Sequence, residues 1–145
     1  MVTDKTAPGQ TETIEMEFDL PHRPEKVWRA LTDPELLREW LLPVIGFKAE
    51  PGAEFMFKTQ PYPGWDGTVS CRMLAIDENR SLRYAWTVPF LETVVTFTLA
   101  PTASGTRLTL VQTGFKAEQK RESGGARYGW KMMGGKLADL LGRIA

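Results

Sequence analysis

Large aromatic side chains recur at alternate positions in several segments of this sequence, and together they would provide the chemistry of an apolar binding pocket. Side chains at alternate positions of a β-strand lie on one face of the sheet. Such a face, closed by an apolar helix, is the usual setting for a small-molecule site. For any one of these residues plain core packing is the alternative interpretation, but their convergence favours a pocket. The aromatic residues that we expect to face inward are Phe18, Phe55, Phe57, Tyr84, Trp86, Phe97 and Trp130.

Gln112 and Gly134 add to this expectation, and each leaves two interpretations open. Gln112 has the same parity as Leu108 and Leu110, so its amide is predicted to face inward. A buried amide needs a hydrogen-bond partner, which a neighbouring side chain or a ligand would supply. Gly134 projects onto the inner face of the last helix, although glycine inside a helix costs about 1 kcal/mol relative to alanine. It marks either a close approach of helix to sheet or space left for a ligand.

The same patterns extend the candidate pocket to other residues on the inner face. Cys71 lies on a strand, Trp40 on a short helix, and Met133 and Leu137 on the last helix. We therefore expect a cavity between the sheet and the last helix. The complete set of predicted pocket residues is Trp40, Phe55, Phe57, Cys71, Tyr84, Trp86, Phe97, Gln112, Trp130, Met133, Gly134 and Leu137.

The residue types that usually carry catalysis form no recognisable constellation. Cys71 has no identifiable base beside it, and a free cysteine on an inner face usually behaves as a small apolar residue. His22, the only histidine, lies between two prolines, which indicates a solvated loop residue rather than a general base. The strand carboxylates have outward parity, and Asp66 is the one acidic residue predicted near a cavity mouth. The sequence predicts no catalytic residue, no metal site and no cofactor.

These side chains must be positioned by strands and a few helices. In residues 13–20 every second position is apolar, which is typical of a half-buried strand. Pro24 and Pro34 suit the first turn of a helix, so two short helices are predicted, the second from Pro34 to about Leu41. Period-two segments then recur between residues 44 and 113, with a bulge near Leu74.

The longest predicted helix covers residues 129–145. Its apolar positions, from Trp130 to Ile144, share one face at about 100° per residue. Residues 116–128 are charged and then glycine-rich, which indicates a loop whose later part begins the helix. The order of elements predicts an α+β fold, with a curved antiparallel sheet of six to seven strands around the long helix and two short helices after the first strand. Residues 1–11 are predicted to be a disordered tail and residues 12–145 a single domain.

Composition excludes several classes of protein. Lysine plus arginine and aspartate plus glutamate number 18 each, so there is no basic surplus for nucleic acid or an anionic membrane. A single cysteine excludes an internal disulfide bond. The first residues lack the apolar stretch of a signal peptide, and no apolar run reaches membrane-spanning length, which favours the cytoplasm. We expect a monomer or homodimer whose partner is a hydrophobic small molecule.

An ordered set of short motifs resembles one known family. The segment Val27–Glu35, VWRALTDPE, followed by Trp40, is similar to the family's N-terminal signature. Gly67-Thr68-Val69, Gly105-Thr106 and Gly129-Trp130 are similar to its later landmarks, in the same order. Over roughly residues 14–141 the chain resembles the AHSA1-like (activator of Hsp90 ATPase homologue 1-like) branch of the START/Bet v 1-like (SRPBCC) superfamily. The resemblance implies a helix-grip fold with a cavity between sheet and helix, and it implies little about chemistry.

Three functions follow as alternatives. The first is a non-enzymatic helix-grip protein that binds an apolar or aromatic small molecule. The second is a cyclase- or aromatase-type enzyme in which Tyr84, Gln112 or Asp66 orients a hydrophobic substrate in the same cavity. The third, suggested by the family name, is an interaction with the chaperone Hsp90, and a single predicted domain without a long charged arm favours it least.

Overall fold

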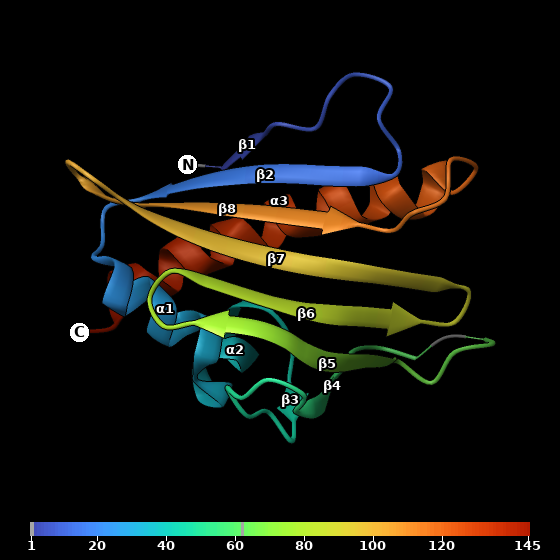
Figure 1. Ribbon diagram of the computed structural model, residues 1–145, viewed down its shortest axis with the longest axis horizontal. Helices are drawn as coiled ribbons and strands as arrows, with labels where there is room; N and C mark the ends of the chain where they lie inside the picture. The colour runs from blue at the N-terminus through green and yellow to red at the C-terminus, as the bar shows by residue number, and fades with distance from the viewer. Residues whose placement is uncertain (1, 62) are drawn as a thin grey trace.

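The protein folds as one curved antiparallel sheet wrapped around a long helix (Figure 1). The computed structural model describes residues 2–61 and 63–145. Eight strands in these residues are hydrogen-bonded in the order β1-β2-β8-β7-β6-β5-β4-β3. The α+β helix-grip architecture predicted from the sequence is confirmed. The strands are β1 (Val2–Asp4), β2 (Thr13–Leu20), β3 (Val44–Ile45), β4 (Glu54–Lys58), β5 (Thr68–Asp77), β6 (Ser81–Val88), β7 (Leu91–Thr102) and β8 (Gly105–Thr113).

The helices are α1 (Pro24–Thr32), α2 (Pro34–Trp40) and α3 (Lys120–Arg143), and the two short ones lie beside the C-terminal end of the long one (Figure 1). Asp33 separates α1 from α2 and caps the second, because its carboxylate accepts a hydrogen bond from the Glu35 amide at 2.9 Å. The Trp40 indole then donates to the Ala30 carbonyl at 2.8 Å. This bond ties the two short helices together.

The structure corrects three sequence-based expectations about the elements. The sheet has eight strands rather than six or seven, because the short strands β1 and β3 are added at its two edges. β1 lies inside the predicted disordered tail and pairs with β2 in the register Val2↔Phe18. α3 begins at Lys120, whereas the sequence predicted a helix over residues 129–145 that only the later part of residues 116–128 would begin. Glycines weaken this helical segment, but the buried side chains of Ser123 and Trp130 hold it in the fold, and such tertiary contacts outweigh weak helix propensity.

The irregularity predicted in the middle of the sheet is present. The pairing of β5 with β6 shifts register between Met73 and Ala75, so Leu74 lies at a bulge and is 44% exposed. A bulge bends its strand and increases the local twist. It therefore contributes to the curvature that lets the sheet wrap around α3.

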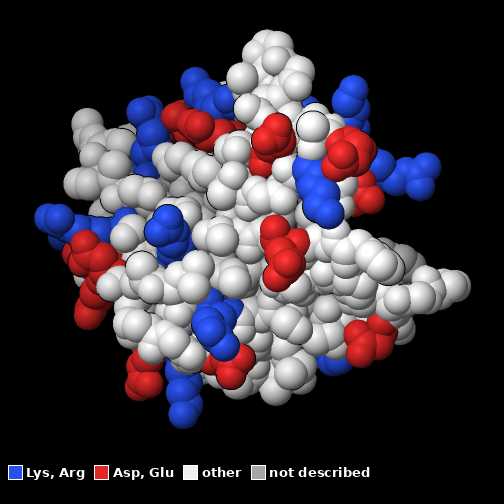
Figure 2. Space-filling model, turned by 45° about the vertical axis from the view of Figure 1, so that its right-hand side comes forward, with Lys and Arg blue, Asp and Glu red and all other residues white. Residues whose placement is uncertain are grey.

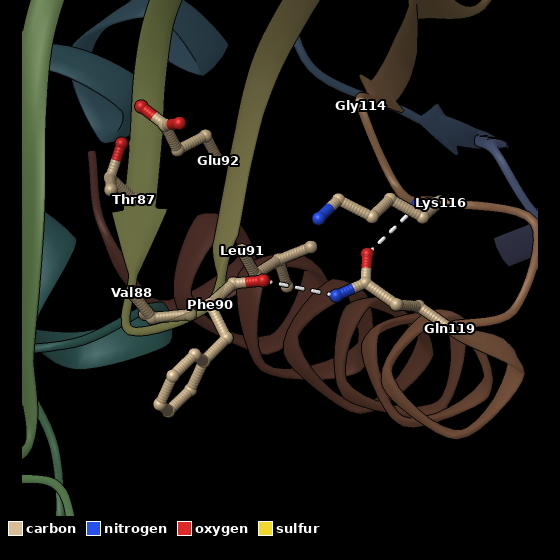
Figure 3. A pocket seen from close by; sticks show the side chains of 8 residues that line it. All are labelled: Thr87, Val88, Phe90, Leu91, Glu92, Gly114, Lys116 and Gln119. Atoms are coloured by element: carbon tan, nitrogen blue, oxygen red, sulfur yellow. Dashed lines mark hydrogen bonds between the residues drawn. The ribbon is translucent and has the colours of Figure 1, made fainter.

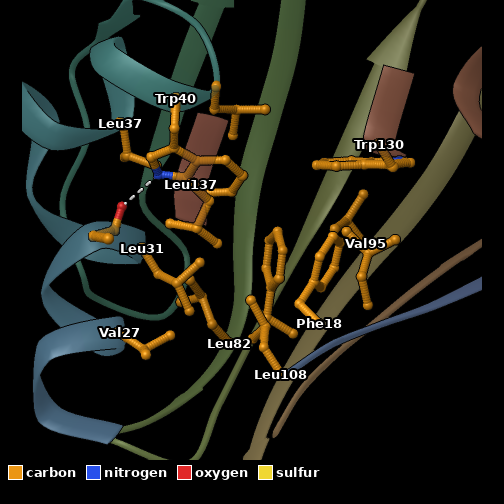
Figure 4. Packing of buried hydrophobic residues seen from close by; sticks show 14 of the residues in the cluster. Phe18, Val27, Leu31, Leu37, Trp40, Leu82, Val95, Leu108, Trp130 and Leu137 are labelled. Carbon is orange, nitrogen blue, oxygen red and sulfur yellow. Dashed lines mark hydrogen bonds between the residues drawn. The ribbon is translucent and has the colours of Figure 1, made fainter. Parts of the chain in front are cut away.

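The core fills the space between the centre of the sheet and the helices (Figure 4). Aromatic rings pack edge to face there: the ring centroids of Trp40 and Phe97 are 6.3 Å apart, and those of Phe55 and Tyr84 are 5.3 Å apart. These four side chains are each at most 4% exposed. The middle of the fold is thus a packed interior.

Candidate functional site

The inner face of α3 meets the sheet in two different ways along its length. At Gly134 the contact is close: an added Cβ atom would lie 2.8 Å from Val2 Cγ2 and nearer still to the Phe18 ring. At Gly125 and Gly129 an added Cβ atom would meet no atom within 4 Å. Of the two interpretations of Gly134, the structure shows close packing. The open space lies earlier in the helix.

Most of the residues predicted to line a ligand pocket belong to the packed core instead. The alternation of the strands correctly identifies an inward-facing side chain, but it does not tell whether a ligand or another side chain fills the space opposite. Here side chains fill it. The residues that this places in the core are Trp40, Phe55, Phe57, Cys71, Tyr84, Phe97, Gly134 and Leu137.

The other four predicted residues, Trp86, Gln112, Trp130 and Met133, line a hollow of about 210 Å³ between the first half of α3 and the sheet. Sequence reasoning missed the rest of the wall, although small residues at helical spacing were a usable signal for part of it. The prediction of a loop over residues 116–128, with only its later part beginning the helix, hid that signal. The missed residues are Leu91, Phe115, Glu122, Gly125, Ala126 and Gly129.

Aromatic rings from three parts of the chain form much of this wall. Trp86 comes from β6, Phe115 follows β8, and Trp130 comes from α3. The ring centroids of Trp86 and Trp130 are 5.7 Å apart, with the ring planes inclined at 56°. Phe115 and Trp130 are each 3% exposed, whereas Trp86 is only half-buried. The hollow therefore offers flat apolar surfaces of the kind that bind ring-shaped molecules.

The polar atoms beside the hollow are satisfied by one another. The Trp130 indole donates to Gln112 Oε1 at 2.8 Å, and Gln112 Nε2 donates to Thr93 Oγ1 at 2.9 Å. The Thr93 hydroxyl in turn donates to the Trp86 carbonyl at 2.8 Å. Among the described residues, no buried side-chain nitrogen or oxygen atom lacks a hydrogen-bond partner. Gln112 thus has protein partners, and the network fixes Trp130 relative to the sheet.

A wider groove of about 530 Å³ adjoins the hollow and shares Leu91 with it (Figure 3). Phe90, at the turn between β6 and β7, has a φ of 68° and is 92% exposed. A positive φ is uncommon for a residue with a side chain. Gln119 holds this turn by donating to the Phe90 carbonyl at 3.0 Å and accepting from the Lys116 amide at 2.8 Å. The rim of the site is therefore tied to the segment that precedes α3.

Figure 2 turns this end of the molecule toward the viewer. Charged side chains gather along the upper part of the face, whereas the lobe at the lower right is largely free of them (Figure 2). The β4–β5 and β6–β7 connections lie at this end of the molecule (Figure 1), and in them Phe90 is exposed and Trp65 is partly buried. This end of the molecule therefore combines a charged upper part with a lobe that carries few charged side chains (Figure 2).

An ion pair holds the first half of α3 to the edge of the sheet. Arg127 contacts the Asp4 carboxylate at 2.7 Å, and Lys131 lies 3.7 Å from the same oxygen atom. Partial burial opposes the charged form of Asp4, but hydrogen bonds from Thr6 and Arg127 outweigh it and lower the pKa of Asp4 to about 2. Asp4 is thus ionised at neutral pH and anchors the helix through β1.

Groups able to perform acid–base or nucleophilic chemistry are not brought together at the hollow. Burial raises the pKa of the Cys71 thiol to about 12, which keeps it protonated at neutral pH. Burial, and secondarily Cys71, also raise the pKa of Tyr84 well above its usual value. Asp66 accepts a hydrogen bond from the Thr68 amide at 3.0 Å, within its own loop. Of the three residues considered for an enzyme, only Gln112 lines the hollow.

The part of the chain that the structure describes contains no group of three or more His, Cys, Asp or Glu residues placed to hold a metal ion. Within residues 2–61 and 63–145, no helix is both long enough and apolar enough to span a membrane.

Comparison with known proteins identifies one family. Residues 21–142 match the family described as activator of Hsp90 ATPase homolog 1-like protein. This match covers the two short helices, most of the sheet and nearly all of α3. A search of curated proteins found no match.

Several solved structures share the fold. Protein MLL2253 from Mesorhizobium loti is 40% identical, with a TM-score of 0.85 over 92% of this chain and 98% of that chain. Protein CV1439 from Chromobacterium violaceum is 26% identical, with a TM-score of 0.73 over 92% of this chain and 99% of that chain. DynU16, encoded in the dynemicin biosynthetic locus, is 21% identical, with a TM-score of 0.79 over 92% of this chain and 48% of that chain. At that identity the likeness to DynU16 concerns the fold alone.

Proposed function

The chain belongs to the activator of Hsp90 ATPase homolog 1-like family, and from this premise we propose that it binds a small hydrophobic molecule. The fold is shared by proteins of many functions, so the choice of function has to rest on the site. We assign the ligand to the hollow between the first half of α3 and the sheet. The packed centre, where the sequence predicted the pocket, is not part of the proposed site.

The observation that carries this proposal is the open space beside Gly125 and Gly129, on a wall shared with Trp86 and Trp130. Glycine inside a helix lowers the stability of that helix by about 1 kcal/mol relative to alanine. No close contact requires glycine at either position, unlike at Gly134. A ligand that occupies this space would explain why glycine is present at these two positions despite its cost to helix stability.

The dimensions of the hollow suit a compact molecule. An apolar cavity of about 150 Å³ accepts benzene, and the hollow measures about 210 Å³. A ligand with one ring or two fused rings therefore fits it. Such a ligand would contact Trp86 and Trp130, so its binding would change the fluorescence of the protein.

The proposal is tested by filling the hollow from the helix. We expect Gly129→Leu to remain folded and to lose binding of 2-naphthol, a neutral two-ring probe, measured by tryptophan fluorescence and by calorimetry. Gly135→Leu is the matched control: Gly135 is exposed, has no atom within 4 Å of an added Cβ atom and lies outside the hollow. Failure of the natural protein to bind the probe, or equal binding by both variants, would overturn the proposal.

A further inference from the structure

The wall of the hollow carries a single charged residue, Glu122, in the first turn of α3. No lysine, arginine or histidine is part of this wall. Building on the ligand-binding function proposed above, we infer that the ligand is a compact aromatic molecule that carries a positively charged nitrogen. In this assignment the aromatic ring lies in the hollow and the charged nitrogen lies near the Glu122 carboxylate.

The Glu122 carboxylate has no ion-pair or hydrogen-bond partner among the described residues. This differs from Asp4, an acidic residue beside the first half of α3, which is paired with Arg127 at 2.7 Å. Lys120 and Arg121 precede Glu122 in the helix, but neither is part of the wall. A negative charge at the edge of an apolar hollow, without a counter-charge in that wall, favours a cation over an anion.

The aromatic walls favour the same class of ligand. Aromatic side chains pair with the ring of a ligand in offset or edge-to-face arrangements. The ring centroids of Trp86 and Trp130 are 5.7 Å apart, and the ring planes are inclined at 56°, so the two rings are not stacked face to face. Phe115 adds a third ring to the wall. Ring contacts and the carboxylate would thus stabilise an arylalkylamine at its two ends.

The size of the effect follows from the exposure of Glu122, which is accessible to solvent. An exposed ion pair changes an equilibrium constant by about two- to fivefold. Most of the affinity would therefore come from the apolar contacts, and the charge would select among ligands of equal size. Because the interaction is exposed, added salt should weaken the selection.

A matched series of probes tests this inference: 2-phenylethylamine, 2-phenylethanol and 3-phenylpropionate, which share one ring and differ in charge. We expect the amine to bind about two- to fivefold more tightly than the alcohol, and the carboxylate to bind most weakly. In Glu122→Gln the amine and the alcohol should bind equally, and in Glu122→Lys the order of amine and carboxylate should reverse. Glu118→Gln, which removes an exposed carboxylate outside the hollow, should retain the natural order.

The outcomes separate this inference from the function on which it rests. Equal binding of the amine and the alcohol to the natural protein, or a preference for the amine that survives in Glu122→Gln, would overturn the charge selection and leave the hydrophobic site intact. Failure of all three probes to bind, together with failure of 2-naphthol, would overturn both. Stability measurements on each variant show whether a change in binding comes from the site or from unfolding.

Discussion

The two halves of α3 are held against the sheet by different kinds of interaction. The second half packs by burial: Leu137, Leu140 and Leu141 are at most 2% exposed, and Gly134 lies against the Phe18 ring. The first half is held at separate points, through the Trp130–Gln112 hydrogen bond and the ion pair of Arg127 with Asp4. One half of the helix is continuous with the core, and the other spans a hollow.

The difference shows how a small domain can keep space inside an otherwise packed fold. Burial of apolar surface is non-directional and favours filling every gap. Hydrogen bonds and ion pairs have fixed lengths and directions, so they can hold two elements at a set separation. In this protein the Gln112–Thr93 network performs that role beside the hollow.

The largest effect on the free energy of unfolding is expected where α3 contacts the sheet. Gly134→Ala would force a methyl group against Phe18 and Val2, and we expect it to lower the free energy of unfolding by about 1–3 kcal/mol, as overpacking does. Gly135→Ala, one residue later, meets no atom within 4 Å and should instead raise it by up to about 1 kcal/mol. Urea denaturation of the two variants measures both values.

If Gly134→Ala proved as stable as Gly135→Ala, the contrast between the two halves of the helix would disappear. The second half would then be as loosely packed as the first. The ligand space would have to be sought again near Gly134, as the sequence had allowed.

The next largest effect on stability is expected at the hydrogen bonds that hold the first half of α3 against the sheet. Trp130→Phe keeps a ring in place but removes the donor to Gln112 Oε1, and we expect a loss of about 1–3 kcal/mol because a buried acceptor is left unpaired. Gln112→Met removes the acceptor instead. A double-mutant cycle on these two positions should give a coupling energy of at least about 0.5 kcal/mol. Additive effects would mean that the bond does not position the helix.

The smallest effect on stability is expected at the edge of the sheet. Asp4→Asn removes the ion pair with the partly exposed Arg127, and we expect a loss of about 0.5–1 kcal/mol at neutral pH. The pKa of Asp4 falls from 3.8 to about 2 on folding, so its stabilising effect is complete above pH 3.8 and disappears as the pH falls through about 2. The stability difference between the natural protein and Asp4→Asn should therefore shrink over that interval. A stability difference that stayed constant down to about pH 2 would contradict this role of Asp4.

Sequence reasoning predicted the fold well because the fold depends on patterns that repeat. Alternating strands, two proline-initiated helices and one amphipathic helix define the helix-grip architecture, and the bulge near Leu74 appeared as a break in alternation. The site was harder to predict because it depends on how far apart two elements lie. The same residue type, glycine, marks a tight contact at Gly134 and open space at Gly129, and only the neighbouring atoms distinguish them.

The glycines of α3 also bear on how a molecule reaches the hollow. Gly124, Gly125 and Gly129 all lie in the first half of the helix, where each lowers helix propensity and none is supported by a close contact. Segments with few buried contacts open locally at a much lower free energy than the whole domain. We expect the amide hydrogens of this half to exchange with solvent sooner than those around Leu137 and Leu141. Local opening of this half of the helix would widen the hollow, so the rate of opening would affect how fast a ligand enters and leaves.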